Sequence, residues 1–283
     1  MTENFQWLVD QFTRWGEACD SLYCAVIVGS QARSDHKADE FSDLDLILIV
    51  EDPGVYISTS QWLGDIGSYH ISFTEKSIGE GMQRRVLFDN ALDVDFMIFP
   101  KSRMETLFSG EIATMLERGY YILIDKIGMK DSIVLPDRAS HCFPEEGDFI
   151  NIVHDFWYHS VWTVKKLKRG EIWAAKSCLD SYMKQLLLSM IEVHARSTRG
   201  LSFPPWHDGR FVDEWAEEWI VEKLGSCFSL YNEQSIENAL LSTMDLYRAI
   251  ALEVAGMQDF KYPDSADEYA TTWVVAALRA PNV

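Results

Sequence analysis

The first half of the chain alternates short apolar runs with polar turns, a pattern typical of strands. Before it, apolar residues recur every three or four positions over residues 4–18 and predict an amphipathic helix. The apolar runs predict strands over residues 22–28, 43–50, 69–73, 84–89, 92–99 and 120–124. Short helices are expected at residues 58–63, 101–107 and 112–118. Residues 90 and 91 would form a hairpin link, and Glu51 to Gly54 give a turn signal.

Beyond residue 146 the apolar positions follow the spacing of helices that bury one face. Helices are expected at about residues 147–167, 172–195, 210–224, 235–254 and from 266 onwards. A polar stretch with Pro136 and Pro144 separates the two patterns. We therefore expect an α+β protein with two domains, a sheet-containing domain over residues 1–135 and a bundle of antiparallel helices over residues 136–283.

Paired acids open two of the predicted strands. Side chains two residues apart in a strand lie on the same face, so Asp43 and Asp45 project together. Asp93 and Asp95 do the same at the start of DVDFMIF. Three carboxylates meeting in one place suit two-metal phosphoryl or nucleotidyl transfer, in which two acids bridge the metal ions and the third accepts a proton from the attacking hydroxyl. Carboxylate oxygens are hard ligands, which favours Mg²⁺.

The strand before this first pair of acids is followed by a turn at Gly29 and Ser30. Glycine allows the backbone to approach a ligand closely, and serine can cap a helix while its hydroxyl faces an anion. A phosphate and a metal ion would then lie side by side. The alternative role of Ser30 is a simple helix cap.

The acidic composition restricts the possible partners. The 283 residues are 47% hydrophobic and 13% aromatic, enough for two domains with cores of their own. A formal net charge of −19 would repel a nucleic acid backbone, so we expect no nucleic acid partner. It would attract a polycation, although an acidic surface can also serve solubility alone.

The sequence gives no indication of export or membrane insertion. No apolar run reaches membrane-spanning length, and residues 1–11 lack the pattern of a signal peptide. The five cysteines are odd in number and form no C-x-x-C pair, which favours reduced thiols. We expect a cytoplasmic protein without a membrane partner.

An ordered set of motifs, spread over about residues 24–223, resembles the aminoglycoside 6-adenylyltransferases of the DNA polymerase β-like nucleotidyltransferase superfamily. The motifs are GSQAR, DEFSDLDL, SQWLGDIG, VLFDNALDVDF and HDFW. The resemblance implies a nucleotidyltransferase palm with a mixed sheet and flanking helices, followed by a helical substrate-binding domain. It further implies an enzyme that uses two Mg²⁺ ions to transfer AMP from ATP to the 6-hydroxyl of streptomycin.

The resemblance also assigns roles to single residues. It selects Asp95, in preference to Asp93, to join Asp43 and Asp45 as metal ligand and catalytic residue. The nucleotide-binding residues that it implies are Gly29, Ser30, Arg33, Lys184 and Arg210, and the substrate-binding residues are Asp155 and Trp157. Lys165 also matches a lysine of the family. The chain departs from the family pattern at Gln31, where an arginine is usual, and at Ser189 and His207, where basic residues are usual.

Other functions remain open at this point. The chain could transfer a nucleotide to a different small molecule or to a protein side chain, although transferases that modify proteins are usually single small palms. A catalytically silent binder with the same fold is a third possibility. Ser189 and His207 favour the silent binder, whereas retention of the three acids argues against it.

Overall fold

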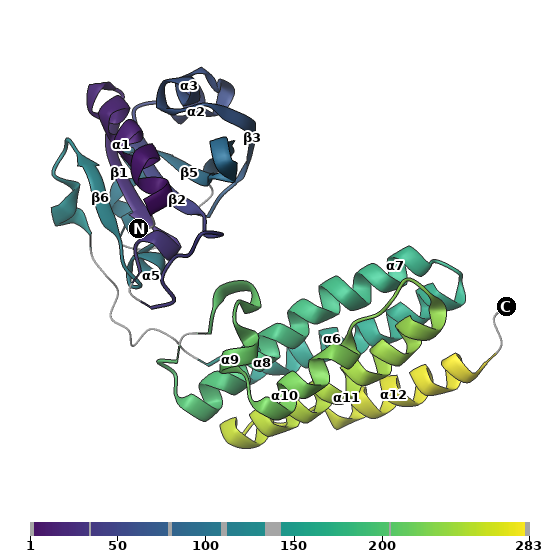
Figure 1. The fold of residues 1–283 in the computed structure, drawn as a ribbon. Coiled ribbons are helices and arrows are strands. Elements are labelled where there is room, and N and C mark those ends of the chain that lie inside the picture. The colour runs from purple at the N-terminus through teal and green to yellow at the C-terminus, as the bar shows by residue number, and fades with distance from the viewer. Residues whose placement is uncertain are drawn as a thin grey trace. The chain divides into compact units, whose positions relative to one another are not determined.

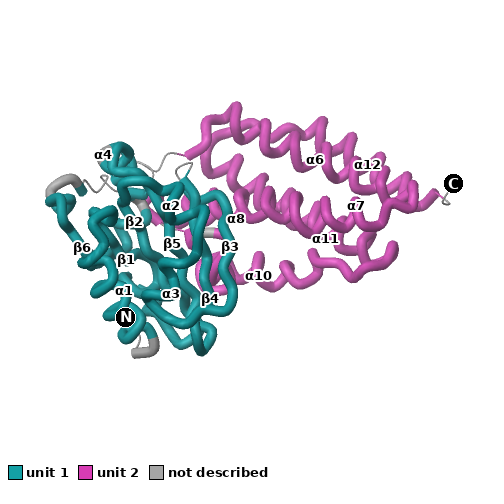
Figure 2. Tube along the Cα trace, turned by 90° about the horizontal axis from the view of Figure 1, so that it is seen from above, with its two compact units in different colours: residues 1–137 teal, residues 138–283 magenta. Residues whose placement is uncertain are grey.

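The computed structural model describes residues 3–33, 35–78, 81–108, 112–133, 143–203 and 205–280. The chain forms two compact units, Met1–Asp137 and Arg138–Val283 (Figure 2). The expected boundary between residues 135 and 136 lies outside the described residues. Among the described residues, no helix combines the length and the apolar character needed to cross a membrane.

Unit 1 is built on one mixed sheet (Figure 1). Its described strands are β1 (Leu22–Val28), β2 (Leu44–Val50), β3 (Tyr69–Lys76), β4 (Met82–Phe88), β5 (Asp93–Pro100) and β6 (Tyr121–Asp125). They are ordered β3-β4-β5-β2-β1-β6. β2 and β5 run parallel, whereas the other neighbouring pairs of described strands run antiparallel. The predicted strands and the mixed sheet are thereby confirmed.

Both faces of the sheet are covered, which explains why the central strands are apolar throughout. Helix α1 (Glu3–Ala18) packs Phe5 and Phe12 on one face, against side chains such as Leu46 and Phe96. The opposite face presents Ile47 and Met97 to the segment around α5 (Ala113–Leu116). Further short helical segments of unit 1 are α2 (Pro53–Ser58), α3 (Gln61–Ile66) and α4 (Met104–Thr106).

The expected turn after β2 proved to be the start of a helix. Pro53 stands at the first position of α2, where a missing N–H costs no hydrogen bond, and Asp52 accepts a bond from the Gly54 N–H at 2.8 Å. Asp-Pro is therefore a helix start at this position. The helix expected at residues 58–63 is replaced by α2 and α3.

Unit 2 is helical, as predicted. Its helices are α6 (Glu146–Lys168), α7 (Ile172–Ser177), α8 (Met183–Arg199), α9 (Val212–Trp215), α10 (Glu218–Leu224), α11 (Glu233–Gln258) and α12 (Asp264–Arg279). A turn of π-helix at Cys178–Tyr182 connects α7 to α8. The continuous helix expected at residues 210–224 is wrong, because Ala216 has extended backbone and separates α9 from α10.

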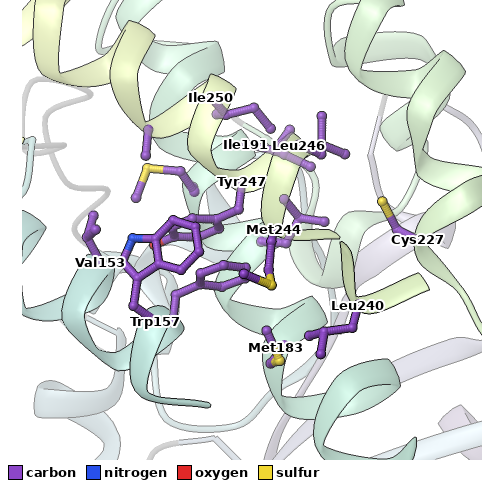
Figure 3. Close-up of a cluster of buried hydrophobic side chains, with 14 of the residues drawn as sticks. Val153, Trp157, Met183, Ile191, Cys227, Leu240, Met244, Leu246, Tyr247 and Ile250 are labelled. Atoms are coloured by element: carbon purple, nitrogen blue, oxygen red, sulfur yellow. The ribbon is translucent and has the colours of Figure 1, made fainter. Parts of the chain in front are cut away.

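An aromatic core holds unit 2 together. The rings of Phe156 and Tyr247 stack with centroids 3.6 Å apart, and Trp157 packs edge-on against Phe156. Figure 3 shows Trp157 and Tyr247 surrounded by aliphatic and methionine side chains. Large aromatic rings bury much apolar area each, so these pairs stabilise the helix packing strongly.

Candidate active site

The turn after β1 is fitted to the acid on β2. Gly29 has φ +69°, in the left-handed region, and a Cβ atom there would lie 2.0 Å from Oδ2 of Asp45. Only glycine leaves room for that carboxylate. Ser30 Oγ and Gln31 Nε2 both donate to the carbonyl oxygen of Asp43, at 3.4 and 3.2 Å. The turn thus holds the segment that carries the acids.

Strand register aligns the acids across the sheet. Asp45 on β2 lies opposite Asp95 on the parallel strand β5. Asp43 precedes β2 by one residue and lies two residues before Asp45. One carboxylate oxygen from each of Asp43, Asp45 and Asp95 lies within 4.8 Å of the other two. Residues that are far apart in the sequence therefore meet at the start of two neighbouring strands.

This cluster has the chemistry of a divalent cation site. Its ligand atoms are carboxylate oxygens, and Asp95 is only 7% exposed. The pKa of Asp95 is raised above its ordinary value, chiefly by burial and also by the charges of Asp93 and Asp43, although Arg85 acts in the opposite direction. Carboxylates so close together repel one another, and a bound Mg²⁺ would relieve that repulsion. The donor set therefore fits a magnesium ion.

Asp93 lies at the edge of the cluster. Burial raises the pKa of Asp93, Arg85 lowers it, and the charge of Asp43 raises it. Arg85 Nη2 is 3.9 Å from its Oδ2. Asp93 therefore contributes negative charge to the surroundings of the three acids.

Arg85 belongs to this site and was not singled out in the sequence. It lies opposite Asp95 on the antiparallel neighbour β4, and its Nε donates to Asp95 Oδ1 at 2.7 Å. The sequence did contain a signal for this contact. In a hairpin centred on residue 90, the numbers of paired residues add to 180, so residue 85 lies opposite residue 95. Such a register would have identified the arginine that faces Asp95.

A cavity of about 470 Å³ opens beside the Gly29–Ser30 turn. Its walls include both cationic and hydroxyl-bearing side chains, which are suited to a phosphorylated ligand. The lining residues are Ser30, Gln31, Ala32, Arg33, Lys37, Ala38 and Tyr121. Arg33 Nε donates to the carbonyl oxygen of His36 at 2.8 Å, which ties this cation to the loop.

The remaining predicted residues lie in unit 2, where Asp155 occupies a polar cluster. Its Oδ2 accepts a hydrogen bond from the Tyr182 hydroxyl at 2.8 Å, and its Oδ1 is 2.7 Å from Nδ1 of His159. The rings of His159 and Tyr182 are 4.4 Å apart. Asp155 is thus a half-buried acid next to aromatic rings.

Lys184 and Trp157 are used by the packing of the helices. Lys184 Nζ donates to the carbonyl of Leu179 at 3.1 Å and to the Thr243 hydroxyl at 3.0 Å, and burial lowers the pKa of Lys184 to about 8. Trp157 is 2% exposed, and its Nε1 donates to Tyr262 Oη at 3.2 Å. These contacts give both residues a structural role, and their assignment to ligand binding stays a prediction without support from the geometry.

The remaining residues singled out in unit 2 are two basic residues and two residues at positions where the family usually has a basic one. Arg210 is exposed, and its carbonyl accepts a bond from Trp215 Nε1 at 2.8 Å. Ser189 is exposed on α8, and Lys165 Nζ lies 5.6 Å from the ring centroid of Trp273. The side chain of His207 lies outside the described part of the structure.

Known proteins resemble this chain over nearly its whole length. The family model for streptomycin adenylyltransferase matches residues 3–276. Aminoglycoside 6-adenylyltransferase of Bacillus subtilis strain 168 is 24% identical over 268 residues, which cover 92% of this chain and 93% of the relative. The enzyme of the same name from Campylobacter jejuni is 23% identical over 255 residues, or 87% of this chain and 86% of the relative.

A solved structure also matches. It is the crystal structure of an aminoglycoside 6-adenyltransferase from Bacillus subtilis, which is 21% identical and aligns with 96% of this chain and 98% of that chain at a TM-score of 0.49. The family model, which extends over nearly the whole sequence, decides the assignment. The chain belongs to the streptomycin adenylyltransferase family of nucleotidyltransferases.

Proposed function

We propose that this protein transfers AMP from ATP to a hydroxyl group of an aminoglycoside, with the 6-hydroxyl of streptomycin as the acceptor. The observation that carries the proposal is the meeting of Asp43, Asp45 and Asp95 within 4.8 Å, beside the Gly29–Ser30 turn. Family membership and the names of the relatives support the same reaction. In this proposal unit 1 is the nucleotidyltransferase palm and unit 2 supplies contacts to the acceptor.

The three acids have distinct duties in this reaction. Asp43, Asp45 and Asp95 would hold two Mg²⁺ ions, which when bound neutralise charge on the transferring phosphoryl group and the leaving group. Asp95 accepts the proton of the acceptor hydroxyl as its oxygen attacks the α-phosphorus of ATP, and pyrophosphate leaves. The near burial of Asp95 limits the water that competes for that proton.

The cavity beside the Gly29–Ser30 turn provides for the phosphates of ATP. The backbone at Gly29 lies close to the acids, and Ser30 offers a hydroxyl at the cavity wall. Arg33 and Lys37 supply positive charge from the same wall, which suits the departing pyrophosphate. Arg33 thereby contacts the phosphates in place of the arginine that the family usually has at the position of Gln31.

Charge supports a polycationic acceptor. A net charge of −19 draws cations toward the protein and disfavours nucleic acids as substrates. Asp155, with the rings of His159 and Tyr182 beside it, is the proposed contact for a cationic group of the acceptor. We place the reaction in the cytoplasm, where ATP is available.

The test is an incubation of the purified protein with α-labelled ATP, Mg²⁺ and a panel of aminoglycosides. We expect pyrophosphate release together with labelled streptomycin, and neither product when EDTA replaces Mg²⁺. Mass spectrometry of the product would identify the modified hydroxyl.

Other results would favour the alternative functions. Label found on a protein and on no panel member would favour a protein acceptor. Thermal stabilisation by streptomycin without turnover would favour a silent binder.

A further inference from the structure

We infer that Arg85 is a positioning residue that fixes the Asp95 carboxylate for proton transfer and at the same time weakens cation binding at the three acids. The inference rests on the proposed function, because it concerns the same site. It assigns to β4, a strand that carries none of the three acids, a part in the reaction.

The register of the sheet places Arg85 in line with the acids. A single row runs across four strands through Arg85 on β4, Asp95 on β5, Asp45 on β2 and Val28 on β1. Residues that lie opposite one another in neighbouring strands share a face of the sheet. The guanidinium therefore lies on the side of the sheet that holds the carboxylate cluster.

The guanidinium is held by acids on both sides of its strand. Its Nε donates to Asp95 Oδ1 at 2.7 Å, Nη2 is 3.9 Å from Asp93 Oδ2, and Nη1 is 3.8 Å from Glu75 Oε1. Glu75 on β3 also accepts a bond from Gln83 Nε2 at 2.7 Å. A planar, always charged group with contacts in three directions has little freedom to rotate, so Asp95 is oriented with it.

The same charge acts against a metal ion. The bond to Asp95 is charge-assisted and short, and it occupies one of the two oxygens of that carboxylate. A positive group this close lowers the affinity of the acids for any cation. Arg85 therefore lowers the affinity of the acids for a metal ion while it holds the Asp95 carboxylate in a fixed position.

The neighbouring arginine shows what a purely structural arginine does on this strand. Arg84 Nε donates to the carbonyl of Tyr56 at 3.0 Å, and its Nη1 donates to Ser72 Oγ at 2.8 Å. Successive residues of a strand face opposite sides, so Arg84 supports α2 on the far face. Arg85, by contrast, makes its shortest charged contact with Asp95, a member of the acidic cluster.

Three variants test the inference. Arg85→Gln removes both the positive charge and the planar set of guanidinium donors. Arg85→Lys keeps the positive charge but not the planar donors. Arg14→Gln is the matched control. Arg14 lies exposed on α1, against the other face of the sheet, and its loss changes the net charge equally. Mn²⁺ affinity is measured without nucleotide by electron paramagnetic resonance, and kcat and KM are measured with ATP and streptomycin.

We expect opposite changes in binding and turnover. In Arg85→Gln, Mn²⁺ should bind about tenfold more tightly, while kcat falls about a hundredfold and KM for streptomycin stays within about twofold of wild type. Arg85→Lys should keep the wild-type Mn²⁺ affinity and recover part of kcat. Arg14→Gln should match wild type in each measurement.

Weaker Mn²⁺ binding in Arg85→Gln, or a kcat equal to that of the Arg14→Gln control, would overturn the inference. A merely structural role would lower metal affinity and turnover together, and thermal unfolding of each variant identifies any loss of fold. If wild-type protein shows no turnover with any aminoglycoside, the proposed function fails. The Mn²⁺ affinities then still decide whether Arg85 opposes cation binding.

Discussion

Asp95 is nearly buried, and it must be ionised to accept a proton from a hydroxyl group. Its surroundings act in both directions, because burial and the neighbouring acids raise its pKa whereas Arg85 lowers it. The raised pKa means that the folded, metal-free protein binds a proton here more tightly than the unfolded chain does. Ionisation of Asp95 therefore reduces stability as the pH rises from the ordinary carboxyl pKa through the raised value.

Replacing Asp95 by asparagine should separate activity from stability. We expect kcat to fall about a thousandfold, because the base is lost. The melting temperature in EDTA at pH 7.5 should be no lower than that of wild type, because the neutral amide cannot ionise. Initial rates and thermal unfolding measure the two effects. A near-normal rate would remove Asp95 from the role of base.

At the scale of elements, the pairing of strands decides which side chains meet. Asp93 and Asp95 share a face of β5 as their spacing predicted, because alternation along a strand is local. Asp43 lies one residue before β2 and still meets Asp45 in the cluster. The pairing of β2 with β5 is not local, since forty-two residues separate Val50 from Asp93. Here the family resemblance, and not spacing, selected Asp95.

Two features of the elements escaped prediction for physical reasons. The run MQRRVLF contains two successive arginines, and only the pairing of β4 with β5 determines which of them faces the acids. The break at Ala216 lies in a sequence without glycine or proline, so no local signal ends the helix there. Tertiary packing decides this break, whereas the residue that faces Asp95 follows from the register of the β4–β5 hairpin.

Lys184 gives a pH-dependent contribution to unit 2. Burial lowers the pKa of Lys184 to about 8 from its ordinary value of 10.5, so between these values the unfolded chain binds more protons than the folded one. Its contribution to stability should therefore rise by on the order of 3 kcal/mol between these pH values. The difference between wild type and Lys184→Met in chemical denaturation, measured at intervals over this range, isolates the effect.

The outcome also bears on the assignment of Lys184 to the nucleotide. If Lys184→Met keeps the wild-type KM for ATP, the residue serves helix packing through Leu179 and Thr243. A pH-independent difference in stability between the two proteins would contradict the lowered pKa.

At the scale of the whole molecule, charge and fold have separate origins. The division into a sheet-containing unit and a helical unit follows from the period of the apolar residues, which changes from strand-like to helical along the chain. The net charge of −19 is the sum over all charged side chains and does not specify the fold. It does bear on how fast a charged substrate arrives.

Salt should therefore affect the two substrates differently. Raising KCl from about 20 mM to about 200 mM shortens the distance over which charges act, so kcat/KM for streptomycin should fall several-fold. The same change should leave kcat/KM for ATP equal or improved, because ATP is an anion. Steady-state rates at constant Mg²⁺ measure both values. An equal decrease for both substrates would point to a general effect of salt on the enzyme.

The side-by-side placement of Asp45 and Asp95 also protects the assembly of the sheet. If β5 slipped by one residue against its neighbours, every side chain would change faces, and Asp95 would enter the apolar layer under α1. An unpaired carboxylate in that layer is strongly unfavourable. The catalytic acids therefore also disfavour a misregistered sheet. A chain with the wrong register would unfold and would not persist as an inactive folded protein.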